Sequence, residues 1–429
     1  MNLIRLFSIS ANIKFFNIGA GLITTILLSK VLQVKDFGTY AFILSMLTIL
    51  TIPAVMGVPE VVVREVARIS STNKLEELNL LFKWIKKTIL ITSSFSIMIF
   101  LIFIFVYKKD VILKENVSLL FFLIICIPVM AVNSIRSSII IGLNHVLLGQ
   151  IIDNIVRPII LMLMLVFCYL LVVDYVSINT AILLYLISLL TAMICGLFLL
   201  KKKMPCMDNI TEINEQGKYK EWTLSALPLA LVSGIYIISQ QVDILLLGLL
   251  SSFESIAIYK IAAQIGVFVI VGQQILRSIL APKFSVLWQK GDLQQLQRIT
   301  IFSSRISCTI ALLISFIFYF YGKFFLSYFF GENYLLAYEP LLILCFGQII
   351  NAACGSTGIL LNMCGKEKES IKGLLVGLSV NIISGFILIP IYGVSGAAIG
   401  AALGAITWNL CLWLIVRKHI GIKPTAFGV

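Results

Sequence analysis

The sequence predicts an all-α protein that crosses a membrane about twelve times. Of its residues, 60% are hydrophobic and only 12% are charged, and the mean hydropathy is +1.04. A soluble domain carries about a quarter charged residues. The composition therefore excludes a soluble protein. It also argues against nucleic acid as the partner that the net charge of +13 would otherwise suggest.

Twelve apolar segments supply the predicted spans, because each is long enough for the roughly 20 residues that a membrane helix needs. Their lengths are similar, and none alternates like the strands of a membrane barrel. In chain order they cover 11–33, 38–58, 86–107, 118–141, 148–172, 178–200, 224–250, 256–281, 302–322, 336–361, 373–391 and 394–416.

Basic residues mark one side of the membrane. They fall in the segment 59–85, in the central loop KKKMPCMDNITEINEQGKYK (201–220) and near both termini. Cytoplasmic segments of membrane proteins carry an excess of Lys and Arg. We therefore predict that both termini are cytoplasmic and that 59–85 is a basic cytoplasmic loop.

An internal repeat divides the chain into halves. Residues 133–144 (NSIRSSIIIGLN) and 351–362 (NAACGSTGILLN) share five of twelve positions, and they end the fourth and tenth predicted spans. Two halves of six spans insert with the same topology, a plan that many transporters use. The sequence predicts a six-helix lobe over 1–200, a cytoplasmic linker over 201–222 and a second lobe over 223–429.

Motifs that carry enzyme chemistry are missing from the sequence. It has two histidines and no HExxH, P-loop or GxSxG pattern. The nine cysteines include no pair at CxxC spacing. We expect no catalytic residue, no metal and no cofactor, so the protein is not expected to be an enzyme.

Charged residues inside the spans are the candidate functional residues. An ion at the centre of a membrane helix costs about 2.5–3.5 kcal/mol on insertion scales, so it should face an aqueous cavity or a partner. Arg157 lies near the middle of the fifth span. Asp153 precedes it by four residues, which on an α-helix puts both on one face where they can pair.

These ions do not follow the repeat, since Arg136 aligns with Cys354 and Arg157 with Leu375. Cations exceed acids, which suits an anionic substrate, because arginine can grip phosphate with two parallel hydrogen bonds. The alternatives are mutual neutralisation of Asp153 and Arg157, and extension of the other cations to lipid headgroups. We predict that the substrate binds Arg157, Arg136, Arg277, Lys14 and Gln273, and that Asp243 and Asp153 are cavity or coupling ions.

Three stretches resemble the Wzx-type O-antigen and polysaccharide flippases, within the multidrug/oligosaccharidyl-lipid/polysaccharide exporter (MOP) superfamily. They are LLSKVLQVKDFGTYAFILSM (27–46), GVPEVVVREVAR (57–68) and QQVDILLLGLLSSFESIAIYKIAAQI (240–265). Only Asp243 carries over from a family motif, and Ala257 stands where the family commonly has Gly. The resemblance implies a MATE-like fold, with two six-helix lobes around a central cavity that opens alternately to each side.

The resemblance also implies a function. The leading hypothesis is transfer of undecaprenyl-diphosphate-linked O-antigen or related repeat units from the cytoplasmic to the periplasmic leaflet of a bacterial inner membrane. H⁺ or Na⁺ is the candidate coupling ion. Expected partners are the lipid-linked oligosaccharide, membrane lipids, and a polysaccharide polymerase and ligase. Two alternatives remain: a multidrug or small-cation antiporter of the same superfamily, whose cavity should carry net acid, and a non-transporting scaffold in polysaccharide assembly.

Overall fold

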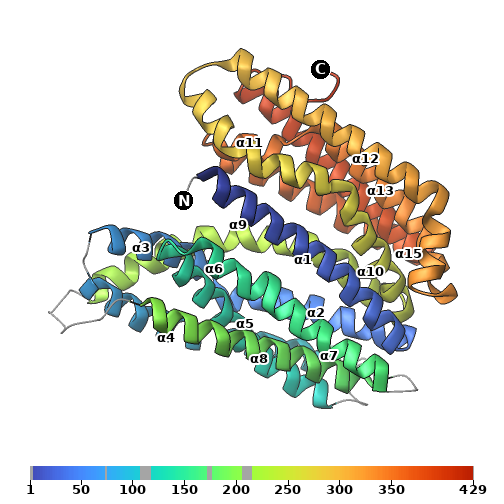
Figure 1. Ribbon diagram of the computed structural model, residues 1–429, viewed down its shortest axis with the longest axis horizontal. Helices are drawn as coiled ribbons and strands as arrows, with labels where there is room; N and C mark the ends of the chain where they lie inside the picture. The colour runs from blue at the N-terminus through green and yellow to red at the C-terminus, as the bar shows by residue number, and fades with distance from the viewer. Residues whose placement is uncertain (1–2, 73–74, 107–116, 172–175, 205–214, 429) are drawn as a thin grey trace. The chain divides into compact units, whose positions relative to one another are not determined.

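The computed structural model describes residues 3–72, 75–106, 117–171, 176–204 and 215–428. Over these ranges the chain is almost entirely helical and forms no strand (Figure 1). The first half contains α1 (Leu3–Val31), α2 (Val34–Val55), α3 (Val58–Thr72), α4 (Leu75–Val106), α5 (Val117–Gly142), α6 (Val146–Ile151), the π-helix η1 (Ile152–Val156), α7 (Arg157–Leu171) and α8 (Ile178–Lys203). The second half contains α9 (Glu215–Leu250), α10 (Phe253–Gly266), the 3₁₀-helix η2 (Val267–Ile270), α11 (Val271–Gln289), α12 (Leu293–Phe329), the 3₁₀-helix η3 (Glu332–Ala337), α13 (Tyr338–Cys354), α14 (Thr357–Met363) and α15 (Glu367–His419).

The prediction of an all-helical membrane protein is confirmed. Within the described ranges, eleven helices are long and apolar enough to cross a membrane. One of them, α15, contains the last two predicted spans, which meet at Gly393 with a φ of 55° and a non-helical ψ of −123°. Large apolar side chains face outward, as a lipid-exposed surface requires: Leu90 is 71% exposed and Leu170 is 74% exposed.

The two halves of α15 pack against each other through small residues. A Cβ at Gly396 would collide with the carbonyl of Leu388, and one at Gly404 would press on Asn381 and the carbonyl of Gly377. Such close approach of membrane helices needs glycine at the interface. The glycines at spacing four in 393–404 therefore serve helix packing.

Contacts along the chain define two compact units. The N unit comprises Asn12–Ala20 and Ile43–Gln241, and the C unit comprises Met1–Ala11, Gly21–Phe42 and Val242–Val429. Residues 223–241, which were predicted to begin the second lobe, group with the N unit. The boundary at 201–222 stays a prediction, since 205–214 lie outside the described residues.

The prediction of a loop over 59–85 is wrong, because this segment is α3 and the beginning of α4. Val58, Val61, Val62, Val66 and Ile69 recur at helical spacing and are buried. That pattern makes one apolar face, and the exposed Arg64 and Arg68 lie on the opposite, polar face. The segment was predicted to be a loop because its many charged residues outweighed the helical spacing of its apolar residues.

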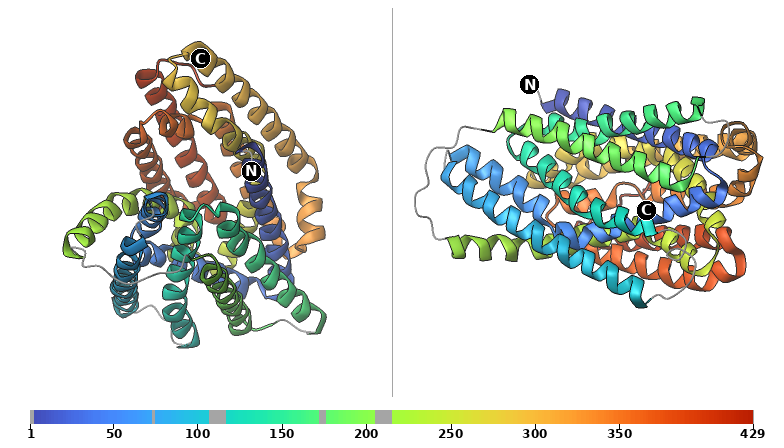
Figure 2. Two further views of the ribbon diagram at one scale, coloured as in Figure 1. Left: turned by 60° about the vertical axis from the view of Figure 1, so that its left-hand side comes forward. Right: turned by 90° about the horizontal axis from the view of Figure 1, so that it is seen from below.

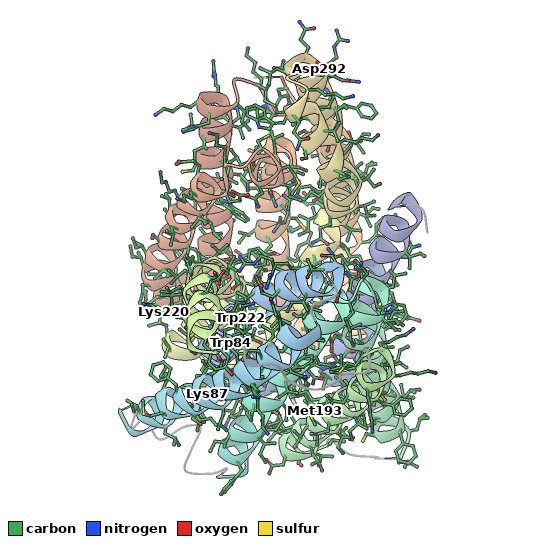
Figure 3. All side chains as sticks on the ribbon, turned by 90° about the vertical axis from the view of Figure 1, so that its left-hand side faces the viewer. Trp84, Lys87, Met193, Lys220, Trp222 and Asp292 are labelled. Atoms are coloured by element: carbon green, nitrogen blue, oxygen red, sulfur yellow. The ribbon has the colours of Figure 1, made fainter. Side chains whose placement is uncertain are left out.

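The beginning of α9 is anchored to α3 and α4 within the N unit. Glu77 Oε2 accepts a hydrogen bond from Arg68 at 2.7 Å and pairs with Lys218 Nζ at 2.6 Å. The rings of Trp84 and Trp222, both almost fully buried, lie 5.5 Å apart between centroids (Figure 3). Ion pairs and the contact of two tilted indole rings thus hold the first turns of α9 on this unit.

The C unit is built from α12, α13 and α15, which pack side by side (Figure 2), with α14 against α11 and α15. The segment 420–428 folds back onto this bundle. Ser304 Oγ donates to the carbonyl of Pro424 at 2.7 Å, and the Ala426 N–H donates to the carbonyl of Ala353 at 2.9 Å. This segment is therefore part of the packed unit.

We predict that Gly38→Ala destabilises the C unit. A Cβ at Gly38 in α2 would collide with the carbonyl oxygen of Phe253, which begins α10. Overpacking of this kind costs about 1–3 kcal/mol. The measurement is the melting temperature of the detergent-solubilised protein. Gly19→Ala in α1 is the control, because a Cβ there meets nothing within 4 Å; equal melting temperatures of the two variants would contradict the prediction.

Candidate functional site

The fifth span is bent where its functional residues lie. Helices α6, η1 and α7 follow one another without a break. Pro158 has no backbone N–H, and its ring crowds the carbonyl four residues earlier, that of Asn154. The helix widens here into a π turn, in which the Arg157 N–H donates to the carbonyl of Ile152. Such turns inside α-helices occur frequently at functional sites.

Asn17 of α1 satisfies the carbonyl that Pro158 leaves without a donor. Its Nδ2 lies 3.3 Å from the carbonyl oxygen of Asn154 and 3.0 Å from Asn154 Oδ1. In lipid, backbone polar groups must find partners inside the protein. Asn17 therefore ties the first span to the bend of the fifth. Sequence analysis missed it, although an Asn inside an apolar segment was a visible signal.

Arg136 of α5 is a buried cation whose charge is balanced inside the N unit. Its side chain is 1% exposed, and its guanidinium donates to Asp153 Oδ1 at 2.7 Å and to the carbonyl of Ala192 at 3.2 Å. Gly196 on α8 makes room for it, since a Cβ there would collide with the guanidinium. The structure thus brings together two predicted site residues, Arg136 and Asp153.

The alternative that Asp153 and Arg157 form an ion pair with each other is not what the structure shows. Asp153 forms its ion pair with Arg136 on a neighbouring helix. The physical reason is η1: in a π turn the hydrogen bonds run between residues five apart, so a spacing of four no longer stacks two side chains on one face. The sequence spacing was read with the period of an α-helix that Pro158 interrupts.

Arg157 instead lies against an aromatic ring. Its Cζ is 4.8 Å from the centroid of the Tyr185 ring on α8, a cation–π distance. Among the residues that the structure describes, no carboxylate forms an ion pair with Arg157. The nearby Asp153 carboxylate feels the charge of Arg157 but forms its ion pair with Arg136, so within the described residues Arg157 has no carboxylate of its own. Tyr185 was missed by sequence analysis, because nothing in its local pattern distinguishes it from a packing aromatic.

The C unit holds a separate buried carboxylate. Asp243 of α9 is 9% exposed, and its Oδ2 accepts a hydrogen bond from the hydroxyl of Tyr259 on α10 at 2.8 Å. Asn381 of α15 is a second hydrogen-bond partner of this carboxylate. One acidic group with two neutral partners can hold a proton or a small cation at modest structural cost.

The remaining predicted residues occupy different environments. Gln273 of α11 is 1% exposed, and its Nε2 donates to the carbonyls of Asn351 and Gly355, so it supports the break between α13 and α14. Arg277 follows it by one turn and is partly buried in the C unit. Lys14 is an exposed residue of α1 in the N unit. Their predicted contacts with a substrate stay predictions.

We predict that Asp153→Ala lowers the melting temperature of the protein. It leaves the Arg136 guanidinium buried without a counter-charge, which costs about 3–5 kcal/mol. The double variant R136M/D153L should recover most of the loss, since an apolar replacement of a whole buried pair is nearly neutral. Glu369→Ala, which breaks the exposed pair with Lys372, is the control and should change little. A double variant as unstable as Asp153→Ala would contradict the prediction.

Solved structures of membrane transporters share this fold. An inward-facing multidrug resistance MATE family transporter of the MOP superfamily aligns with 94% of this chain and 94% of its own, with a TM-score of 0.69 and 14% identity. The lipid II flippase MurJ in an inward closed conformation aligns with 96% of this chain and 87% of its own, with a TM-score of 0.66 and 14% identity. A MOP superfamily transporter from Pyrococcus furiosus gives a TM-score of 0.62 at 15% identity, over 97% of this chain and 95% of its own.

Two curated proteins are similar over shorter stretches. An uncharacterized membrane protein of Methanocaldococcus jannaschii is 31% identical over 144 residues, which cover 32% of this chain and 27% of the relative. The lipid II flippase MurJ of Bacillus subtilis is 30% identical over 103 residues, which cover 24% of this chain and 18% of the relative. The chain thus matches about a quarter or less of the length of these relatives.

The family model described as polysaccharide biosynthesis protein matches residues 4–288, more than half of the chain. This match includes α1 to α11 almost completely, and so contains the bend of span five with Arg136, Asp153 and Arg157. The fold of the whole chain is that of the MATE transporters and MurJ. The protein is a multi-pass membrane protein that belongs to the polysaccharide biosynthesis protein family.

Proposed function

We propose that the protein is a flippase for undecaprenyl-diphosphate-linked oligosaccharides, O-antigen or related repeat units. It would move them by alternating access from the cytoplasmic to the periplasmic leaflet of a bacterial inner membrane, with both termini in the cytoplasm. The family match supports a role in polysaccharide biosynthesis, and the similarity to MurJ supports a lipid-linked substrate. A flippase moves its substrate without breaking covalent bonds, which agrees with the lack of enzyme motifs in the sequence.

The single observation that carries this proposal is the charge on Arg157. A cation near the middle of a membrane span is costly unless it faces water or an anion. Within the described residues its neighbours offer an aromatic ring and one carboxylate, Asp153, whose ion pair is with Arg136, so two cations share one acidic group. A diphosphate supplies the missing negative charge, and the guanidinium edge matches two phosphate oxygens at once. The site is therefore suited to the head of a diphosphate-linked lipid.

The other predicted site residues have different proposed roles. Arg136 acts on the site through Asp153, because its own charge is already paired. Arg277, Lys14 and Gln273 are proposed to contact the phosphate or sugar as the substrate passes. A polymerase and a ligase that use the exported repeat unit remain the proposed protein partners.

Asp243 is the proposed coupling residue. The carboxylate is buried beside neutral partners, Tyr259 and Asn381, and no basic residue in the described part of the chain forms an ion pair with it. Binding of H⁺ or Na⁺ would neutralise it without breaking a salt bridge. Ion binding at Asp243 would then make transport of the substrate respond to an ion gradient across the membrane.

A multidrug or small-cation antiporter is the second candidate function. The fold shared with multidrug resistance transporters and the buried Asp243 favour it. The unbalanced Arg157 opposes it, since a cationic drug would be repelled there. Drug susceptibility of a strain that lacks the gene separates the two candidates.

We predict that loss of the gene traps lipid-linked repeat units in the cytoplasmic leaflet and abolishes surface polysaccharide. The measurement is the leaflet sidedness of extracted lipid-linked oligosaccharides, with the wild-type gene as rescue. Arg157→Ala should not rescue, because the phosphate contact is lost, and Arg157→Lys should rescue in part, because it keeps the charge without the bidentate geometry. Full rescue by both variants would remove Arg157 from the site, and normal sidedness in the deletion strain would overturn the flippase proposal.

We predict that Asp243→Asn uncouples transport from an ion gradient. The amide keeps the size of the side chain but cannot bind a proton or Na⁺ by charge. The measurement is transport in vesicles with an imposed pH or Na⁺ gradient. Asp292→Asn is the control, since Asp292 caps α12 outside the spans and Asn is an equally good N-cap (Figure 3). A normal gradient response of Asp243→Asn would end the coupling role.

A further inference from the structure

The guanidinium of Arg157 lies over one face of the Tyr185 ring. A guanidinium is planar, and its N–H groups point outward in that plane. With the ring on one side of Cζ, the N–H groups that point away from the ring are available for a ligand. We infer that Tyr185 is a positioning residue that holds Arg157 for bidentate binding of the phosphate group of the substrate; this inference rests on the proposed flippase function.

The Tyr185 ring is itself held in place. It is 8% exposed and belongs to α8, which packs against α5 and α7. Phe122 of α5 contacts it edge to face, with 6.2 Å between the ring centroids and 65° between the ring planes. Two aromatic rings in this arrangement attract each other and fix their mutual orientation. The platform under Arg157 is thus a rigid part of the N unit core.

The backbone end of Arg157 is fixed as well. Its N–H closes the π turn on the carbonyl of Ile152, and Asn17 fastens the same turn to α1. With its Cα held by η1 and its guanidinium held by Tyr185, the side chain loses much of its rotamer freedom before a ligand arrives. Preorganisation of this kind raises affinity, because less entropy is lost on binding.

An aromatic partner also preserves the charge that a carboxylate would cancel. The ring face attracts a cation through its quadrupole and carries no net charge. Asp153 is only four residues away in sequence and is paired with Arg136. Arg136 and Arg157 thus have different tasks: Arg136 forms the ion pair with Asp153, and Arg157, held by Tyr185, contributes the excess positive charge of the three residues to the substrate.

The test uses the full-length protein at equal abundance in vesicles, with the initial rate of transfer between leaflets measured at several concentrations of the lipid-linked substrate. Tyr185→Phe and Tyr185→Trp keep a ring face and should transport like wild type. Tyr185→Leu removes the ring and should raise the KM for the lipid-linked substrate about fivefold to tenfold, the loss expected for one partly buried cation–π contact. Tyr169→Leu is the matched control, because Tyr169 on α7 is 50% exposed toward the surface.

A second measurement separates positioning from general stability. In the Arg157→Lys background, which keeps part of the transport, Tyr185→Leu should cause a smaller fold loss than in the wild type, because the ring acts by orienting the planar guanidinium. Wild-type transport by Tyr185→Leu, with Arg157→Ala inactive, would overturn the positioning role and leave the flippase proposal intact. Loss of transport in Tyr185→Phe and Tyr185→Trp would also overturn it. Wild-type transport by Arg157→Ala would instead overturn the proposed function of the site.

Discussion

Inside a bilayer every backbone carbonyl needs a donor from within the protein, and at Asn154 this requirement shapes the N unit. Pro158 cannot supply the donor, so the helix widens into η1 and Asn17 supplies it from α1. The bend in span five and the tie between the first and fifth spans are two consequences of one missing N–H.

The same bend sets the electrostatics of the unit. On a continuous α-helix, Asp153 and Arg157 would stack and cancel each other. With the π turn between them, Asp153 pairs with Arg136, while Arg157 lies over Tyr185 and keeps its charge. A membrane protein normally avoids such a charge unless it is used. The structural argument for an anionic substrate therefore begins with the π turn that precedes Pro158.

The two copies of the internal repeat, 133–144 and 351–362, differ in the contacts that they make. In the first copy, Arg136 fills the space beside Gly196 and reaches Asp153. In the second copy, Cys354 is followed by Gly355 with a φ of 79°, which breaks the helix, and Gln273 satisfies the carbonyls of that break. The shared residues Asn133 and Asn351 both end in polar contacts within their own unit. Both copies pack as helices. Within these two twelve-residue segments, only the first contains a charged side chain, Arg136.

The sequence by itself determined the membrane class, the twelve spans and the residues that carry charge in the spans. These follow from composition and from segment length, which act locally along the chain. The tertiary structure alone decided which charges meet. The partner of Asp153 lies 17 positions away on another helix, Tyr185 is 28 positions from Arg157, and Asn17 is 137 positions from Asn154. It also revealed α3 in the basic segment, where charge concealed an apolar face. Local periodicity assumes an uninterrupted helix, and Pro158 breaks that assumption at the residues on which function depends.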